Sequence, residues 1–167
     1  MQIERQNGFG RRRVWTKAGM VAATGAAIVL AGCSASGTTG ASTVHAPAAV
    51  HVGRSSLGAI LTDGRGRSVY LFEKDHGRST CYGACGGQWP PVETAGAPVP
   101  GTGTMPSLVG TAARTDGAIQ VTYAGHPLYY FAGDNNPGDT TGEGLQNFGG
   151  GWDLVSPAGQ KVEQGGH

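Results

Sequence analysis

Two tyrosine–aspartate pairs carry the spacing that first suggests chemistry in this 167-residue chain. The pattern Tyr-x-Phe-x-x-Asp occurs twice at a constant offset, because 129 − 70 and 134 − 75 both equal 59. A tyrosine beside a carboxylate could serve general acid–base catalysis. It could also be a buried hydroxyl whose aspartate accepts its hydrogen bond or caps the following turn. No histidine, serine or second carboxylate recurs beside the pair, so we favour the structural role. The motif residues are Tyr70, Phe72, Asp75, Tyr129, Phe131 and Asp134.

Cys81 and Cys85 form the next constellation, and their spacing fits a disulfide, a metal site or a redox-active dithiol. In an exported protein, oxidising surroundings favour the disulfide. Closing a loop of about five residues would contribute about 2 kcal/mol in the chain-entropy model. Thiolates with His76 nearby, and with Met105 or His126 as further ligands, would instead suit Cu(I). We favour the disulfide, since the spacing alone does not complete a copper site.

A glycine-rich loop in the second half of the chain collects oxygen-bearing side chains that could hold Ca²⁺. The candidates are Asp134, Asn136, Asp139 and Glu143. The loop lacks the EF-hand pattern, and ordinary turn chemistry explains its Asp, Asn, Pro and Gly residues equally well. We therefore predict no resident metal or cofactor.

One tryptophan follows each copy of the motif, Trp89 in the first and Trp152 in the second. Trp89 could stack on a sugar, or it could lie in the core. Because each copy supplies one tryptophan, the two positions are expected to be equivalent, and we favour the core.

Short β-branched and aromatic runs separated by glycine turns must position these residues, and no window shows a sustained helical period. Asp116-Gly117 predicts a two-residue type I′ turn, and Gly66 and Gly125 are expected to serve the same need in other hairpins. In the motif strands, Tyr and Phe share one face and apolar neighbours the other, so both strands should be buried. We expect an all-β, compact antiparallel sheet, sandwich- or barrel-like. The predicted strands cover 58–63, 68–73, 108–114, 118–123, 127–132 and 152–155.

The two motif copies belong to a longer self-similarity, because the glycine turns upstream of them keep the same offset. Residues from about 57 to 159 resemble the secreted repeat found in tandem in bacterial lipoproteins and known by its Tyr-x-(aromatic)-x-x-Asp motif. Glu143 departs from that resemblance, which leads us to expect Gln there. The resemblance implies two pseudo-equivalent repeats, at about 55–95 and 108–159. It implies no activity, because the repeat is one of unknown function.

Residues 1–32 are predicted to be a lipoprotein signal peptide. A positive region at 11–17 precedes an apolar stretch at 18–30, which is shorter than the roughly 20 residues that span a bilayer. The stretch ends in Leu-Ala-Gly before Cys33, which resembles a lipobox whose cysteine receives the lipid. The paired arginines resemble a twin-arginine signal, and the general secretory route fits as well. We expect a lipid-anchored protein on the extracytoplasmic side of the cell membrane.

Residues 33–54 are expected to be a lipidated, disordered tether, and residues 160–167 a loose tail. Residues 1–32 hold five of the 12 basic and one of the 11 acidic residues, so the rest carries 7 − 10 = −3. No basic cluster remains that would bind nucleic acid. The sequence therefore predicts a non-catalytic envelope module, either structural or binding a glycan or protein. The alternative is a redox or copper-handling lipoprotein that uses Cys81 and Cys85.

Overall fold

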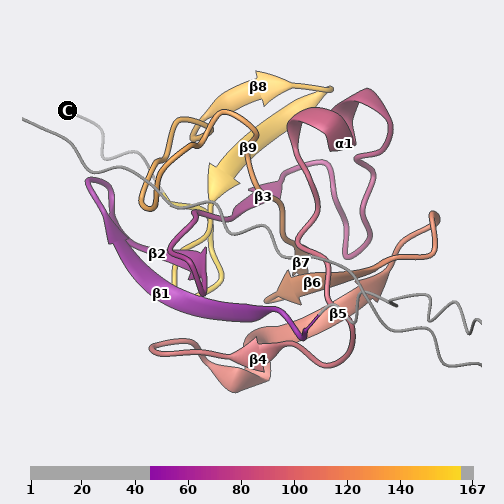
Figure 1. Cartoon of the computed structure of the whole chain (residues 1–167). Coiled ribbons are helices and arrows are strands. Elements are labelled where there is room, and N and C mark those ends of the chain that lie inside the picture. Colours follow the sequence, from indigo (N-terminus) through magenta and orange to yellow (C-terminus); the bar gives the residue numbers. More distant parts are fainter. Residues whose placement is uncertain (1–45, 163–167) are drawn as a thin grey trace, which may run out of the picture. The chain divides into compact units, whose positions relative to one another are not determined.

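The computed structural model describes residues 46–162, which belong to one compact unit. The predicted signal peptide, the Cys33 lipid site, residues 34–45 of the tether and residues 163–167 of the tail lie outside the described residues. The elements in chain order (Figure 1) are β1 (Ala49–Ser55), β2 (Gly58–Asp63), β3 (Tyr70–Phe72), α1 (Ala84–Gln88), β4 (Val99–Pro100), the 3-10 turn η1 (Pro106–Leu108), β5 (Val109–Ala113), β6 (Ile119–Tyr123), β7 (His126–Pro127), β8 (Leu145–Asn147) and β9 (Gly150–Leu154).

These strands form three small sheets, ordered β2-β1-β4, β3-β9-β8 and β5-β6-β7. All neighbours pair antiparallel except β1 and β4, which are parallel. Figure 1 shows β8 and β9 beside β3, with the β5-β6-β7 sheet forming a separate group. The all-β prediction is confirmed, and the sheets of the described region do not close into a barrel.

The two motif copies meet at the centre of the domain. The Tyr70 amide donates to the Tyr129 carbonyl at 2.8 Å, and the Tyr129 amide donates to the Tyr70 carbonyl at 2.9 Å. Along β3, Tyr70 and Phe72 face one apolar cluster, which contains the disulfide, Trp89 and Trp152. Their neighbours in sequence face a second cluster built on valines and leucines. Since every residue of β3 is buried, the prediction of a strand with two apolar faces is confirmed for the first motif copy.

The second motif copy does not form the predicted strand over 127–132. The regular strand β7 ends at Pro127, and beyond it Tyr129 makes single bridges to Tyr70 on one side and to Pro91 on the other. The first copy is also shorter than the predicted 68–73. The first segment pairs with β9 over all three of its strand residues, whereas the second makes only single bridges at Tyr129 and so forms no ladder of its own.

The predicted type I′ turn at Asp116-Gly117 is wrong. Gly117 alone of the pair has a positive φ, 90°, and Arg114 donates its amide to the Ala118 carbonyl. This is a three-residue loop that ends in a left-handed glycine, which needs only one special φ. The Asp116 carboxylate accepts the Ala118 amide and so supports an ordinary backbone conformation at its own position. Gly125, in contrast, lies in a two-residue turn as expected.

The folded domain starts earlier and ends later than the sequence suggests. Strand β1 occupies 49–55, within the expected tether, and pairs along its length with β2. The reason is that Val50 is buried in the second cluster and Val52 packs against it, so this segment has an apolar face. At the other end, the Val162 amide donates to the Leu154 carbonyl, which attaches residues expected to be loose.

Candidate functional site

The motif tyrosines and aspartates form hydrogen bonds, but each bond joins one repeat to the other. Tyr70 donates to Asp134 at 2.7 Å, and Tyr129 donates to Asp75 at 2.6 Å. The other oxygen of each aspartate accepts the amide and hydroxyl of a threonine in its own loop, Thr80 for Asp75 and its counterpart Thr141 for Asp134. Each aspartate therefore ties its own loop to the motif tyrosine of the opposite repeat.

This setting keeps both motif tyrosines protonated. Burial, and then the hydrogen bond to the aspartate, raise the pKa of Tyr70 far above its ordinary value. The same two causes, in the same order, raise the pKa of Tyr129 through Asp75. Both tyrosine residues have 0% exposed surface, so neither hydroxyl meets a substrate from solvent. The arrangement supports the structural role that the sequence favours.

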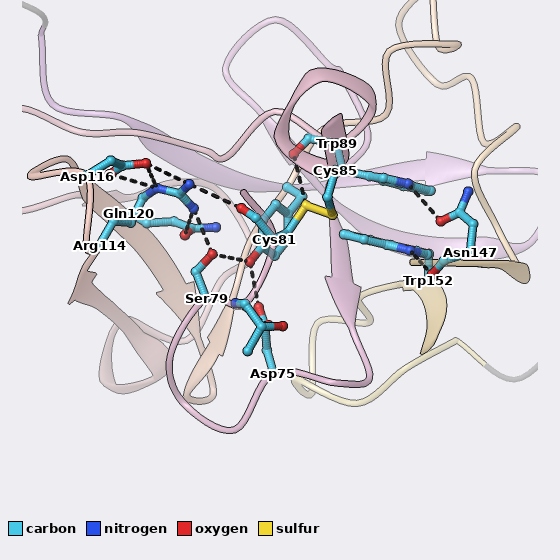
Figure 2. Close-up of a disulfide and its surroundings, with 12 residues drawn as sticks. Asp75, Ser79, Cys81, Cys85, Trp89, Arg114, Asp116, Gln120, Asn147 and Trp152 are labelled. Carbon is cyan, nitrogen blue, oxygen red and sulfur yellow. Dashed lines mark hydrogen bonds and ion pairs between the residues drawn. A yellow bond between two sulfur atoms is a disulfide. The ribbon is translucent and has the colours of Figure 1, made fainter. Parts of the chain in front are cut away.

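The aromatic side chains repeat the same exchange between repeats. Trp89 and Trp152 stack face to face, with ring centres 3.9 Å apart (Figure 2). Phe72 stacks on Trp152 at 4.1 Å, and Phe131 packs against Trp89 at 4.5 Å. Asn147 accepts a hydrogen bond from each indole, through its side chain and its backbone carbonyl. Trp89 is fully buried, so it is a core residue and offers no face to a sugar.

The predicted disulfide joins Cys81 and Cys85 beside this stack (Figure 2). Cys85 lies on the short helix α1, and the exposed fractions of Cys81 and Cys85 are 0% and 7%. Bonded sulfurs are not thiolates, so they do not provide the ligands that a copper site would need. His76 is exposed, and Met105 is 45% exposed with its amide bonded to the Tyr123 hydroxyl.

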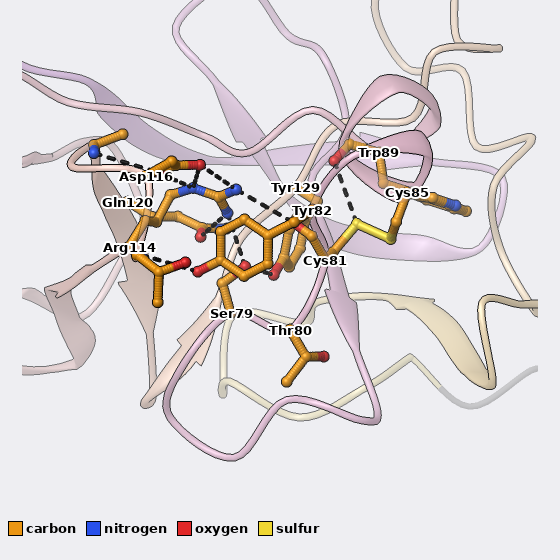
Figure 3. Close-up of polar contacts among 12 residues, drawn as sticks. Ser79, Thr80, Cys81, Tyr82, Cys85, Trp89, Arg114, Asp116, Gln120 and Tyr129 are labelled. Carbon is orange, nitrogen blue, oxygen red and sulfur yellow. Dashed lines mark hydrogen bonds and ion pairs between the residues drawn. A yellow bond between two sulfur atoms is a disulfide. The ribbon is translucent and has the colours of Figure 1, made fainter.

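A buried arginine links the disulfide loop to the hairpin of β5 and β6, and sequence reasoning missed it. The Arg114 side chain is 3% exposed, and Figure 3 shows its guanidinium at the centre of the network. The guanidinium lies over the Tyr82 ring at 4.4 Å and donates to four groups: Asp116, the Ser79 hydroxyl, the Gln120 side chain and the Cys81 carbonyl. In the sequence, the only signal for this buried arginine was a charge at the end of an otherwise apolar run.

Two open hollows lie where the repeats carry different side chains. The His126 hollow, of about 390 Å³, is lined by Leu71, Phe72, Glu73, Asp75, His76, His126, Gln160 and Lys161. The Arg67 hollow, of about 490 Å³, is lined by residues 46–49 and 63–65 with Arg67, Glu93 and Tyr130.

The hollows contain equivalent positions of the two repeats, because 126 − 67 and 130 − 71 both equal the repeat offset of 59. Arg67 of one repeat lies over Tyr130 of the other, and His126 shares its hollow with Leu71. Sequence reasoning missed this, although the offset that revealed the motif would have paired these positions.

Comparison with known protein families shows which family this chain belongs to. Residues 52–93 and 110–156 each match a family described as a secreted repeat of unknown function. The chain belongs to this family. Neither the curated proteins nor the solved structures include a match to it.

The secreted repeats indicate an extracytoplasmic location. Such compartments are oxidising, and disulfides persist there. Within residues 46–162, no helix has the length and apolar character to cross a membrane. The anchor at Cys33 is a prediction from the sequence.

In the glycine-rich loop of the second secreted repeat, Asp139 supports a turn and Glu143 bonds to strand β9. One Asp139 oxygen accepts the amides of Asn135 and Asn136, and one Glu143 oxygen accepts the Leu154 amide. Across residues 46–162, no three His, Cys, Asp or Glu side chains gather where they could hold a metal ion.

Proposed function

We propose that this secreted-repeat protein is a lipid-anchored, non-catalytic binding module of the cell envelope. Its lipid would be carried by Cys33, and its two repeats would stand outside the membrane and bind an envelope glycan or a protein. The lipobox and the positive region before it support the anchor, and membership of a secreted family supports the location.

One observation carries the binding role. The two repeats place the same residue types in contact at the core, and they carry different residue types at equivalent positions near the surface. Tyr, Phe, Asp and Trp of each repeat are engaged with their counterparts at the core. At the equivalent outer positions, one repeat offers Arg67 and the other His126. A duplicated fold needs no such difference, so the difference points to recognition.

The two hollows suit recognition of a sugar or short peptide. Their volumes, about 390 and 490 Å³, fall within the range of ligand pockets. The apolar residues Leu71 and Phe72 contribute to the lining of the His126 hollow. Hydrogen-bonding groups line it as well, including the Lys161–Glu73 ion pair at 3.0 Å. Such a mixture of apolar and polar lining is typical of binding sites.

Co-sedimentation of the purified protein with insoluble cell wall tests the proposal. We expect binding that is weakened in a double variant, His76→Ala with Arg67→Gln, which alters both hollows. Arg78→Ala is the matched control, because Arg78 is exposed in the same repeat and lines neither hollow. Failure of the wild-type protein to bind cell wall or any envelope protein would refute the binding role.

Membrane fractionation of cells tests the anchor separately. The Cys33→Ala variant should move from the membrane to the soluble fraction, whereas a Cys81→Ser, Cys85→Ser variant should stay with the membrane. A Cys33→Ala protein that remains membrane-bound would refute the anchor.

A further inference from the structure

The Arg67 hollow holds a guanidinium that two neighbours fix in place. The Nε atom of Arg67 donates to Asp63 at 2.9 Å, and the Cζ atom lies 3.8 Å from the centre of the Tyr130 ring. The side chain is nevertheless 45% exposed. A guanidinium already held by a carboxylate and a ring loses little freedom when it binds a ligand, which favours recognition.

The Asp63 carboxylate holds Arg67 and Tyr130 in place. One oxygen accepts the backbone amides of Arg65 and Arg67 at 2.8 and 3.0 Å, and the other accepts the Arg67 Nε and the Tyr130 hydroxyl. Partial burial opposes its charge, yet the backbone hydrogen bonds from Arg67 and Arg65 hold the pKa of Asp63 below its ordinary value. Only 11% of the side chain is exposed, so its charge is met by protein donors.

Arg67 and Arg65 retain positively charged N–H groups that can donate to a ligand. A guanidinium has several N–H groups, and the hydrogen bonds that Arg67 makes from its side chain to described residues use Nε. Arg65 is exposed on the same turn, and its side chain forms no ion pair with residues 46–162. Arginine matches the geometry of carboxylate and phosphate groups, to which it donates two parallel hydrogen bonds.

We propose that the Arg67 hollow binds a carboxylate or phosphate group of an envelope polymer, with Arg67 as the main donor and Arg65 as a second positive charge. This rests on the proposed function, because it names the ligand chemistry of that binding module. The apolar residues 46–49 also line the hollow and would contact the uncharged part of the ligand.

Glu93 places a negative charge in the same hollow as Arg67. It is exposed and forms no ion pair within residues 46–162. Its negative charge opposes an anion that approaches Arg67. Replacing it by Gln keeps the shape and removes the repulsion, so Glu93→Gln should bind the anion more tightly.

Isothermal titration of the purified full chain at low salt tests the proposal, with glycerol phosphate and an N-acetylmuramic acid disaccharide (both sugars N-acetylated) as probes. The first carries only phosphate and the second only carboxylate, so the pair identifies the source of the anion. We expect Arg67→Gln to lose affinity at least about tenfold, which equals the loss of one charge-assisted hydrogen bond. Arg65→Gln should lose a smaller factor, Glu93→Gln should gain, and the control Arg78→Gln should equal wild type.

Arg67 also packs on Tyr130, so its variant could lose affinity through misfolding. Arg65→Gln and Glu93→Gln break no hydrogen bond of a side chain and must still move affinity in opposite directions. No binding of either probe, or equal affinity in all variants, overturns the inference. If cell wall is bound equally by wild type and Arg67→Gln, the inference fails and the proposed function stands. If the probes bind but wall and envelope proteins do not, the proposed function fails.

Discussion

The crossed hydrogen bond from Tyr129 to Asp75 offers a direct test of how the repeats hold each other. Tyr129→Phe removes a hydroxyl that lies 2.6 Å from Asp75 and 2.7 Å from Ser79. Asp75 is 5% exposed and would keep only its two bonds from Thr80. Water has little access to replace the missing donor, so the variant leaves a buried carboxylate undersatisfied.

The size of the effect follows from the charge of the acceptor. A hydrogen bond to a charged group contributes about 1.5–3 kcal/mol, so Tyr129→Phe should lower the free energy of unfolding by about 2 kcal/mol. The matched variant in the other repeat is Tyr70→Phe. Its acceptor Asp134 is only half-buried, so water can replace the hydroxyl and the loss should be about 1 kcal/mol. The symmetric motif should therefore give an asymmetric result.

Urea unfolding followed by tryptophan fluorescence measures these changes, because both motif-associated tryptophans are in the core. Tyr82→Phe is the control, since its hydroxyl accepts the exposed Thr115 amide and its loss should cost below about 0.5 kcal/mol. A double-mutant cycle of Tyr129→Phe with Asp75→Asn should show a coupling energy of about 1 kcal/mol or more. Zero coupling, or a Tyr129→Phe cost no greater than that of Tyr82→Phe, would refute the reasoning.

Three further variants test other contacts. Glu143→Gln should be more stable than wild type at neutral pH, because burial raises the pKa of Glu143 and the folded state therefore loses stability as pH rises through that value. The advantage should shrink below the ordinary glutamate pKa, as urea unfolding across pH would show. Replacing Cys81 and Cys85 by serine should cost about 2 kcal/mol, from the freed loop. Gly142→Ala should cost about 1–3 kcal/mol, since its Cβ would lie 2.8 Å from a stacked indole. Its control is Gly87→Ala, which meets nothing within 4 Å and should be neutral or stabilising.

Each of these variants has an outcome that would contradict its premise. A less stable Glu143→Gln at neutral pH would mean that the carboxylate has a partner beyond the Leu154 amide. Unchanged unfolding without the disulfide would show that the loop is already ordered by Arg114. Equal stabilities of Gly142→Ala and Gly87→Ala would show that the aromatic stack can shift to admit a methyl group.

Local patterns in the sequence predicted a large share of the fold. Strands β2, β5, β6 and β9 lie close to their predicted ranges, because alternation and glycine turns act over a few residues. The disulfide was predictable for the same reason, since its loop is short. Strand β1 was missed because Ser, Thr, Ala and Gly surround it, and the burial of Val50 and the pairing with β2 and β4 that order it are tertiary contacts. The Asp116 turn was misassigned because its side-chain bond to Ala118 overrides the dipeptide preference.

The repeat period can be read from the sequence by comparing it with itself, and the burial of the motif follows from the alternation of neighbouring residues. The partner of each motif residue cannot be read in this way. Tyr70 bonds to Asp134 and Tyr129 bonds to Asp75 across 64 and 54 residues, because the two repeats pair backbone to backbone at Tyr70 and Tyr129. The same packing brings Arg67 over Tyr130 and buries Arg114 behind the disulfide loop. Hydrophobic alternation decides which face of a strand is buried, but only the tertiary arrangement decides which side chains pack against that face.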